Sequence, residues 1–300
     1  MAKILIHEVG LRDGLQMEQK SAPTELKIKW IDSLVNSGVD IIQVGSFVHP
    51  VKMPQMADTD EIFTYLTTEY KKSRDVIFSG LVLNEKGVER AFKCGVDMIC
   101  FGVSASETHS QKNTGMSVAD ATKRIVEVAK MAMNAGKKVQ ASVQSAFGCG
   151  FEGKVDPAKV IGIVDKYLDA GIRNISLADT AGHANTKQVE LYFTEMFNLC
   201  PDIVAACHFH NTYGLGMANT LKALEVGVQS LETAVGGLGG CPFTKTAAGN
   251  VSTEDLVHSL QRMGYKKGID LNALIDIAKD LSEFLGKELP GLVYKTGPIK

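Results

Sequence analysis

A short pattern recurs along the chain: an amphipathic stretch ends, a glycine follows, and a run rich in β-branched residues begins. It reads SGVDII, CGVDMI, AGIRNI and VGVQSL at four widely separated places. Glycine after a helix commonly adopts the left-handed conformation that ends it, and β-branched residues favour strands. Repetition of helix and then strand predicts βα units, and therefore a parallel sheet covered by helices.

Strand-like runs and helical stretches alternate over the whole chain. The runs are 3–9, 39–45, 76–82, 96–103, 138–144, 173–178, 203–210 and 228–234. About eight βα units in 300 residues predict a (β/α)8 TIM barrel, with a doubly wound open sheet as the alternative. The segment 271–285 predicts an extra C-terminal amphipathic helix that covers a barrel end or makes a subunit contact. No linker divides the sequence, so we expect a single catalytic domain over 1–300.

Several residues signal where the helices begin and end. Thr24, Ser117 and Asp156 are expected N-caps, and Pro157 suits a first helical position. Left-handed glycines are expected at the C-terminal ends of four helices. These glycines are Gly38, Gly136, Gly171 and Gly227.

Composition excludes several classes of protein. Lys and Arg number 32 against 34 Asp and Glu, which gives a net charge of -2 and no basic surface for nucleic acid.

The N-terminus lacks the pattern of a secretory or transit signal, and no apolar run is long enough to span a membrane. We therefore expect a cytoplasmic protein. The 6 cysteines are scattered without a CxxC pair, which does not indicate a disulfide framework.

Polar residues follow the predicted strands, at the end where TIM-barrel active sites lie. The loops after different strands would bring these residues together from distant parts of the chain. The candidates are Arg12, Asp13, Gln43, Asp179, His208, His210, Cys241 and Asn250.

His208 and His210 are two residues apart in a strand-like run, so their side chains would share one face. Taken alone, the pair is more typical of hydrogen-bonded side chains at a strand end. With the carboxylate of Asp13 and the amide oxygen of Asn250 they form a nitrogen and oxygen set that suits Mg²⁺, Mn²⁺, Co²⁺ or Zn²⁺. We favour Mg²⁺ or Mn²⁺, because structural zinc is usually closed by four Cys or His ligands. The competing interpretation makes Asp13 a turn or N-cap carboxylate and Asn250 a turn former.

Cys241 lies in GGLGGCPF, whose glycines allow unusual backbone angles. Such a loop would close over a substrate and deliver a thiol. The alternative is a small buried hydrophobic residue. No helix opens directly after the glycines, so the segment is not a dinucleotide-binding fingerprint.

Seven segments, in order over nearly the whole chain, resemble the 3-hydroxy-3-methylglutaryl-CoA (HMG-CoA) lyase family. The segment 236–257 is the most specific of them and separates the lyases from the condensing synthases of the same barrel superfamily. The segments are EVGLRDGLQ, SFVHPVKMPQMAD, SASETHSQKN, FGCGFEGKVDPAKV, SLADTAGHANT, HFHNTYGLGMANT and GGLGGCPFTKTAAGNVSTEDLV.

The resemblance implies cleavage of a 3-hydroxyacyl-CoA to acetyl-CoA and a ketone-bearing acid, acetoacetate in the case of HMG-CoA, with an acyl-CoA as the ligand. For a barrel of this kind we expect a homodimer. The resemblance also implies that Arg12 stabilises the enolate and that the Cys241 thiol protonates it. Asp179 matches a further active-site carboxylate, and Gln43 and Asn113 are expected to contact the substrate. The implied metal ligands are Asp13, His208, His210 and Asn250.

Two positions depart from the resemblance. Gln43 stands where the family usually has glutamate, and Asn211 where it commonly has aspartate. A neutral amide cannot act as a base, so a related hydroxyacyl-CoA is an alternative substrate. A condensing synthase or aldolase on the same barrel, and a non-catalytic barrel that binds acyl-CoA, are further alternatives.

Overall fold

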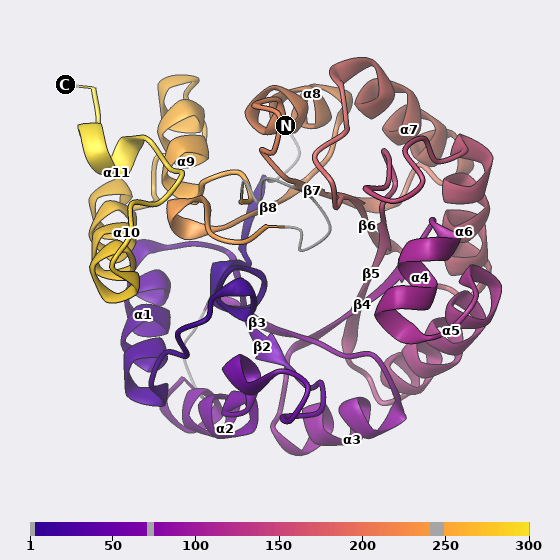
Figure 1. The fold of residues 1–300 in the computed structure, drawn as a ribbon, viewed down its shortest axis with the longest axis horizontal. Coiled ribbons are helices and arrows are strands. Elements are labelled where there is room, and N and C mark those ends of the chain that lie inside the picture. The colour runs from indigo at the N-terminus through magenta and orange to yellow at the C-terminus, as the bar shows by residue number, and fades with distance from the viewer. Residues whose placement is uncertain (1–3, 71–74, 241–248, 300) are drawn as a thin grey trace.

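The chain folds into a closed barrel of parallel strands in this computed structural model, which describes residues 4–70, 75–240 and 249–299 (Figure 1). Each strand pairs with the next in the sequence, and β8 pairs with β1 to close the barrel. The predicted TIM barrel is confirmed. The strands are β1 Leu5–Glu8, β2 Ile41–Ser46, β3 Ile77–Leu81, β4 Met98–Ser104, β5 Lys138–Gln144, β6 Asn174–Asp179, β7 Val204–Phe209 and β8 Ser230–Thr233.

Helices surround the barrel and bury the outward faces of the strands (Figure 1). They are α1 Thr24–Ser37, α2 Thr59–Glu69, α3 Glu85–Lys93, α4 Glu107–Thr114, α5 Val118–Asn134, α6 Pro157–Asp169, α7 Thr186–Leu199, α8 Gly216–Val226, α9 Thr253–Arg262, α10 Leu271–Leu285 and α11 Val293–Thr296. Short turns of other helical types are η1 Gly10–Gly14, η2 Leu15–Met17, η3 Pro54–Met56 and η4 Val235–Gly237. None of the described helices has the length and hydropathy needed to cross a bilayer.

Most of the predicted helix ends are confirmed. The side chains of Ser117 and Asp156 accept bonds from backbone N–H groups in the first turns of α5 and α6. All four predicted glycines have positive φ, from 75° at Gly136 to 114° at Gly227. The prediction for Thr24 was wrong: Pro23, with extended ψ, occupies the N-cap position of α1, and the Thr24 hydroxyl donates instead to a neighbouring carboxylate.

The extra C-terminal helix, α10, is confirmed over the predicted residues; it does not cover a barrel end, and the subunit contact stays a prediction. The helix packs beside α1 in the outer ring (Figure 1). The indole of Trp30 on α1 donates a hydrogen bond of 2.7 Å to Asp280 on α10, and its ring meets Phe284 edge-on at 5.6 Å. These contacts make α10 part of the helical layer.

The inside of the barrel is more polar than is usual, since TIM-barrel interiors are commonly filled by branched apolar side chains. A small apolar cluster around Ile41, Met98 and Cys100 fills part of it. His7 and Glu232, on the paired strands β1 and β8, are also buried. The polar interior lies beneath the carboxyl ends of the strands, where TIM-barrel active sites lie.

Candidate metal centre and active site

The turn after β1 carries Arg12 and Asp13 over the mouth of the barrel. Residues Gly10–Gly14 form a single π-helical turn, a feature that is frequent at functional sites. Glu8 anchors its start, because one carboxylate oxygen accepts bonds from the backbone N–H groups of Gly10 at 2.7 Å and Val235 at 3.1 Å. A Cβ at Gly10 would lie 2.6 Å from that oxygen, so a larger residue there would displace the carboxylate that anchors the turn.

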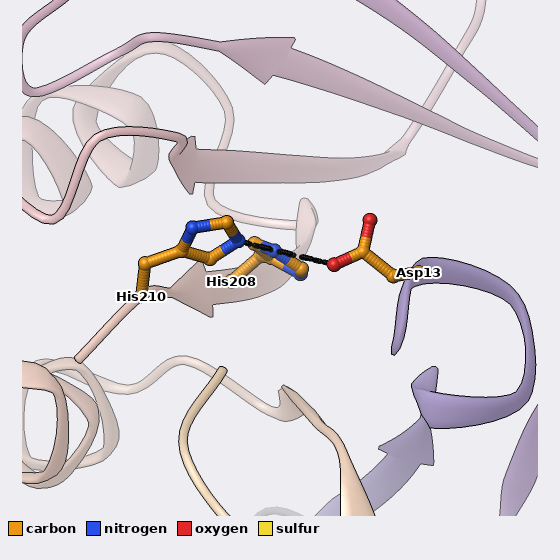
Figure 2. A group of neighbouring side chains, drawn as sticks. All are labelled: Asp13, His208 and His210. Carbon is orange, nitrogen blue, oxygen red and sulfur yellow. Dashed lines mark hydrogen bonds and ion pairs between the residues drawn. The ribbon is translucent and has the colours of Figure 1, made fainter. Parts of the chain in front are cut away.

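His208 and His210 share one face at the end of β7, as the spacing predicts. Their Nε2 atoms are 3.1 Å apart, and each lies 3.8 Å from Oδ2 of Asp13. Figure 2 shows the Asp13 carboxylate, carried by the turn after β1, facing the imidazoles of His208 at the end of β7 and of His210 just beyond it. Two nitrogen ligands of one octahedral ion with bonds of about 2.1 Å also lie about 3 Å apart. The pair is therefore spaced as ligands of a single divalent cation.

A single antiparallel β-bridge pairs the backbone of Asn250 with that of His210 and brings Asn250 to this group. Its Nδ2 donates to Asp13 Oδ2 at 2.8 Å and to the carbonyl of Leu238 at 2.9 Å. Its side-chain oxygen is buried and has no hydrogen-bond partner among the described residues. Buried polar atoms rarely stay unpaired, so this oxygen is suited to a bound cation. The predicted ligand set thus comes together, and its chemistry fits a divalent metal ion.

Charges around Asp13 favour its ionised form. Burial by itself would raise the pKa of this carboxyl, but the Arg12 guanidinium 2.7 Å away and the two imidazoles hold the pKa well below its ordinary range. Burial also opposes protonation of His208, yet the hydrogen bond to Glu232 and the charge of Asp13 raise its pKa overall. Asp13 therefore carries a negative charge that faces both imidazoles.

Gln43 holds the Arg12 side chain in place. Its side-chain oxygen accepts a bond from Arg12 Nε, while Arg12 Nη1 donates to Asp13. The side-chain hydrogen bonds of Arg12 use Nε and Nη1 and leave Nη2 without a partner within the described parts of the chain. Arg12 also lines the adjoining cavity. The guanidinium therefore has N–H groups left for a developing negative charge.

A cavity of about 360 Å³ opens beside these groups. Its wall includes the predicted Asn113 from α4, together with Arg12, Asp13 and both histidines. The sequence predictions missed Lys52, Ser142, Gln144 and Glu232, which also line it. The alternation of polar residues in KVQASVQ would have indicated Ser142 and Gln144, since residues two apart in a strand share a face.

Asp179, another predicted site residue, forms its hydrogen bonds within the loop that follows β6. The carboxylate oxygens of Asp179 accept bonds from the backbone N–H groups of His183 at 2.8 Å and Ala184 at 3.0 Å. Burial raises the pKa of Asp179 to about 6. These bonds shape the loop after β6, and the catalytic role of Asp179 stays a prediction. Cys241 lies outside the described residues.

Comparisons with known proteins agree with this arrangement. A family model described as HMGL-like matches residues 3–281. The chain is 37% identical to a hydroxymethylglutaryl-CoA lyase of Bacillus subtilis over 96% of this chain and 95% of that protein. It is 36% identical to an (R)-citramalyl-CoA lyase of Chloroflexus aurantiacus over 100% of this chain and 96% of that protein.

A solved structure extends the similarity to three dimensions. The chain resembles an HMG-CoA lyase from Acinetobacter baumannii in complex with coenzyme A and 3-methylmalate, with a TM-score of 0.91 and 39% identity. The similarity covers 99% of this chain and 95% of that one. Together with the family match and the barrel, it establishes that the chain belongs to the HMGL-like family of carbon–carbon lyases.

Proposed function

We propose that this enzyme cleaves HMG-CoA to acetyl-CoA and acetoacetate, with Mg²⁺ or Mn²⁺ held by Asp13, His208, His210 and Asn250. The observation that carries the proposal is the convergence of this ligand group with the Arg12 guanidinium at one cavity. The similarity to the Bacillus subtilis lyase supports it. We further propose that the chain acts as one catalytic domain and assembles as a homodimer.

The reaction breaks a carbon–carbon bond of the acyl group. The substrate hydroxyl loses its proton, its oxygen forms the new carbonyl, and the electron pair of the broken bond moves onto the thioester oxygen as an enolate. A bound divalent cation supplies Lewis-acid stabilisation of the hydroxyl oxygen. Asp13, whose carboxylate faces His208, accepts the hydroxyl proton, and Arg12 stabilises the enolate oxygen with N–H groups that have no partner among the described residues.

The remaining steps depend on a proton donor and on the absence of water. We assign protonation of the enolate carbon to the Cys241 thiol, as the family resemblance implies. The apolar side chains of Val48, Met53, Leu81 and Leu83 form part of the cavity wall. Such a surface excludes water and strengthens the interaction between Arg12 and the enolate.

A second candidate substrate is citramalyl-CoA. Its acyl group lacks one methylene between the hydroxyl carbon and the free carboxylate, and its cleavage gives acetyl-CoA and pyruvate. Two observations favour it: the similarity to the Chloroflexus aurantiacus lyase, and Gln43 in place of the usual glutamate beside Arg12. One methylene changes enzyme specificity by about 1–3 kcal/mol, so the preference between the two substrates is measurable.

An assay of hydroxyacyl-CoA thioesters with Mg²⁺ or Mn²⁺ tests the proposal, with acetyl-CoA followed by mass spectrometry. We expect the highest kcat/KM with HMG-CoA and no acetyl-CoA release by an Asp13→Ala variant. A higher value with citramalyl-CoA would transfer the assignment to that substrate. Release of free thiol from acetyl-CoA and a 2-oxo acid would instead indicate a condensing synthase. Binding of acyl-CoA without metal-dependent cleavage of any thioester would indicate a non-catalytic barrel.

A further inference from the structure

Glu232 lies directly behind one of the two imidazoles at the centre of the site. It is on β8, paired in register with His208 on β7, and both side chains point into the barrel. Oε2 of Glu232 lies 3.1 Å from Nδ1 of His208. The other ring nitrogen of His208, Nε2, is the atom that faces Asp13 and His210.

This contact selects one tautomer of His208. An ionised carboxylate only accepts hydrogen bonds, so Nδ1 of His208 must carry a proton to pair with Glu232. A neutral His208 then has its lone pair on Nε2, where a metal ligand needs it. His210 differs, because its Nδ1 has no hydrogen-bond partner among the described residues. Glu232 therefore acts on one histidine of the pair.

Stability of the fold does not account for Glu232. Its side chain is 9% exposed, and Oε1 has no hydrogen-bond partner within the described residues. An unpaired buried polar atom costs about 1–3 kcal/mol. An apolar side chain is the usual occupant of such a position inside a TIM barrel. The presence of a carboxylate at Glu232 is better explained by its effect on His208.

We propose that Glu232 is a positioning residue that fixes the orientation and tautomer of His208 for metal binding. The inference rests on the metal centre of the proposed function. Carboxylates behind metal-binding histidines typically contribute 10–100-fold to metal affinity. Glu232 touches neither the reacting atoms nor the metal in this role.

Binding of Mn²⁺ to the whole protein, measured by calorimetry, tests the proposal without an activity assay. We expect Glu232→Leu to weaken Mn²⁺ binding by about 10–100-fold, and Glu232→Gln to weaken it less, because its amide oxygen still accepts from Nδ1. Ser230→Ala is the matched control, since Ser230 lies two residues earlier on β8 and its hydroxyl has no described partner. It should bind Mn²⁺ as the wild type does.

The tautomer of His208 gives an independent measurement. Nitrogen-15 NMR of the metal-free protein at alkaline pH should show the proton on Nδ1 in the wild type, and a shift toward Nε2 in Glu232→Leu. Equal Mn²⁺ affinity in the wild type and Glu232→Leu, even with lower stability, would overturn the inference and leave the proposed function intact. Failure of the wild type to bind Mn²⁺ or Mg²⁺ would overturn the metal centre itself.

Discussion

Replacement of Asp13 by Asn tests the centre most directly, because it removes the one carboxylate of the ligand group while nearly conserving shape. In the wild type, Arg12 donates to Oδ1 at 2.7 Å and Asn250 donates to Oδ2 at 2.8 Å. An amide at residue 13 has only one acceptor oxygen, so its NH₂ group would meet one of these donors. A lost charge-assisted hydrogen bond lowers the free energy of unfolding by about 2 kcal/mol.

Asp13→Asn should weaken metal binding by more free energy than it costs in stability. Two unit charges about 4 Å apart near a protein surface interact by about 4 kcal/mol, and a divalent ion doubles the charge on one side. Even after partial compensation, a loss of about 3 kcal/mol weakens binding more than about 100-fold. Calorimetry with Mn²⁺ measures this loss, and acetyl-CoA release should fall with it.

Asp40→Asn is the control for the loss of an ion-paired carboxylate. Asp40 precedes β2 and pairs with Lys266, and its oxygen accepts from the backbone N–H of Ile6. This variant should lose stability but keep its Mn²⁺ affinity. If Asp13→Asn binds Mn²⁺ within a few-fold of the wild type, the ligand assignment is refuted.

Three further predictions follow from the same contacts. Asn250→Ala should weaken Mn²⁺ binding by about tenfold in calorimetry, because it removes an amide oxygen ligand. Gln43→Glu would place a charge against Arg12 and should change HMG-CoA turnover several-fold; if the wild type turns over HMG-CoA as well as this variant or better, Gln43 no longer argues for another substrate. Burial raises the pKa of Glu8 to about 7, so the folded state binds a proton that the unfolded state releases. The free energy of unfolding should therefore fall as pH rises from about 5 to 7, and fall less in Glu8→Gln, as denaturation at several pH values would show.

Much of the site was predictable because, in a TIM barrel, residues that follow different strands lie close together at one end of the barrel. Polar residues directly after parallel strands meet at one end of the barrel, so Asp13, His208, His210 and Asn250 were expected to converge. Period-two spacing placed both histidines on one face. The departure at Gln43 was also visible from the sequence, but its contact with Arg12 was not, because the contact depends on how the π-helical turn after β1 places Arg12 against β2.

The sequence alone was enough to determine the strands and most helix ends, because these follow from periodicity and backbone preference within a few residues. It also determined the ligand chemistry, because this follows from the identity of the side chains. The tertiary structure decided what depends on packing between distant segments. It placed α10 beside α1, turned Asp13 toward the histidines through a π-helical turn, and set Glu232 behind His208. A lone glutamate in a strand-like run carries no signal of its partner. Only the register between the neighbouring strands β7 and β8 places Glu232 beside His208.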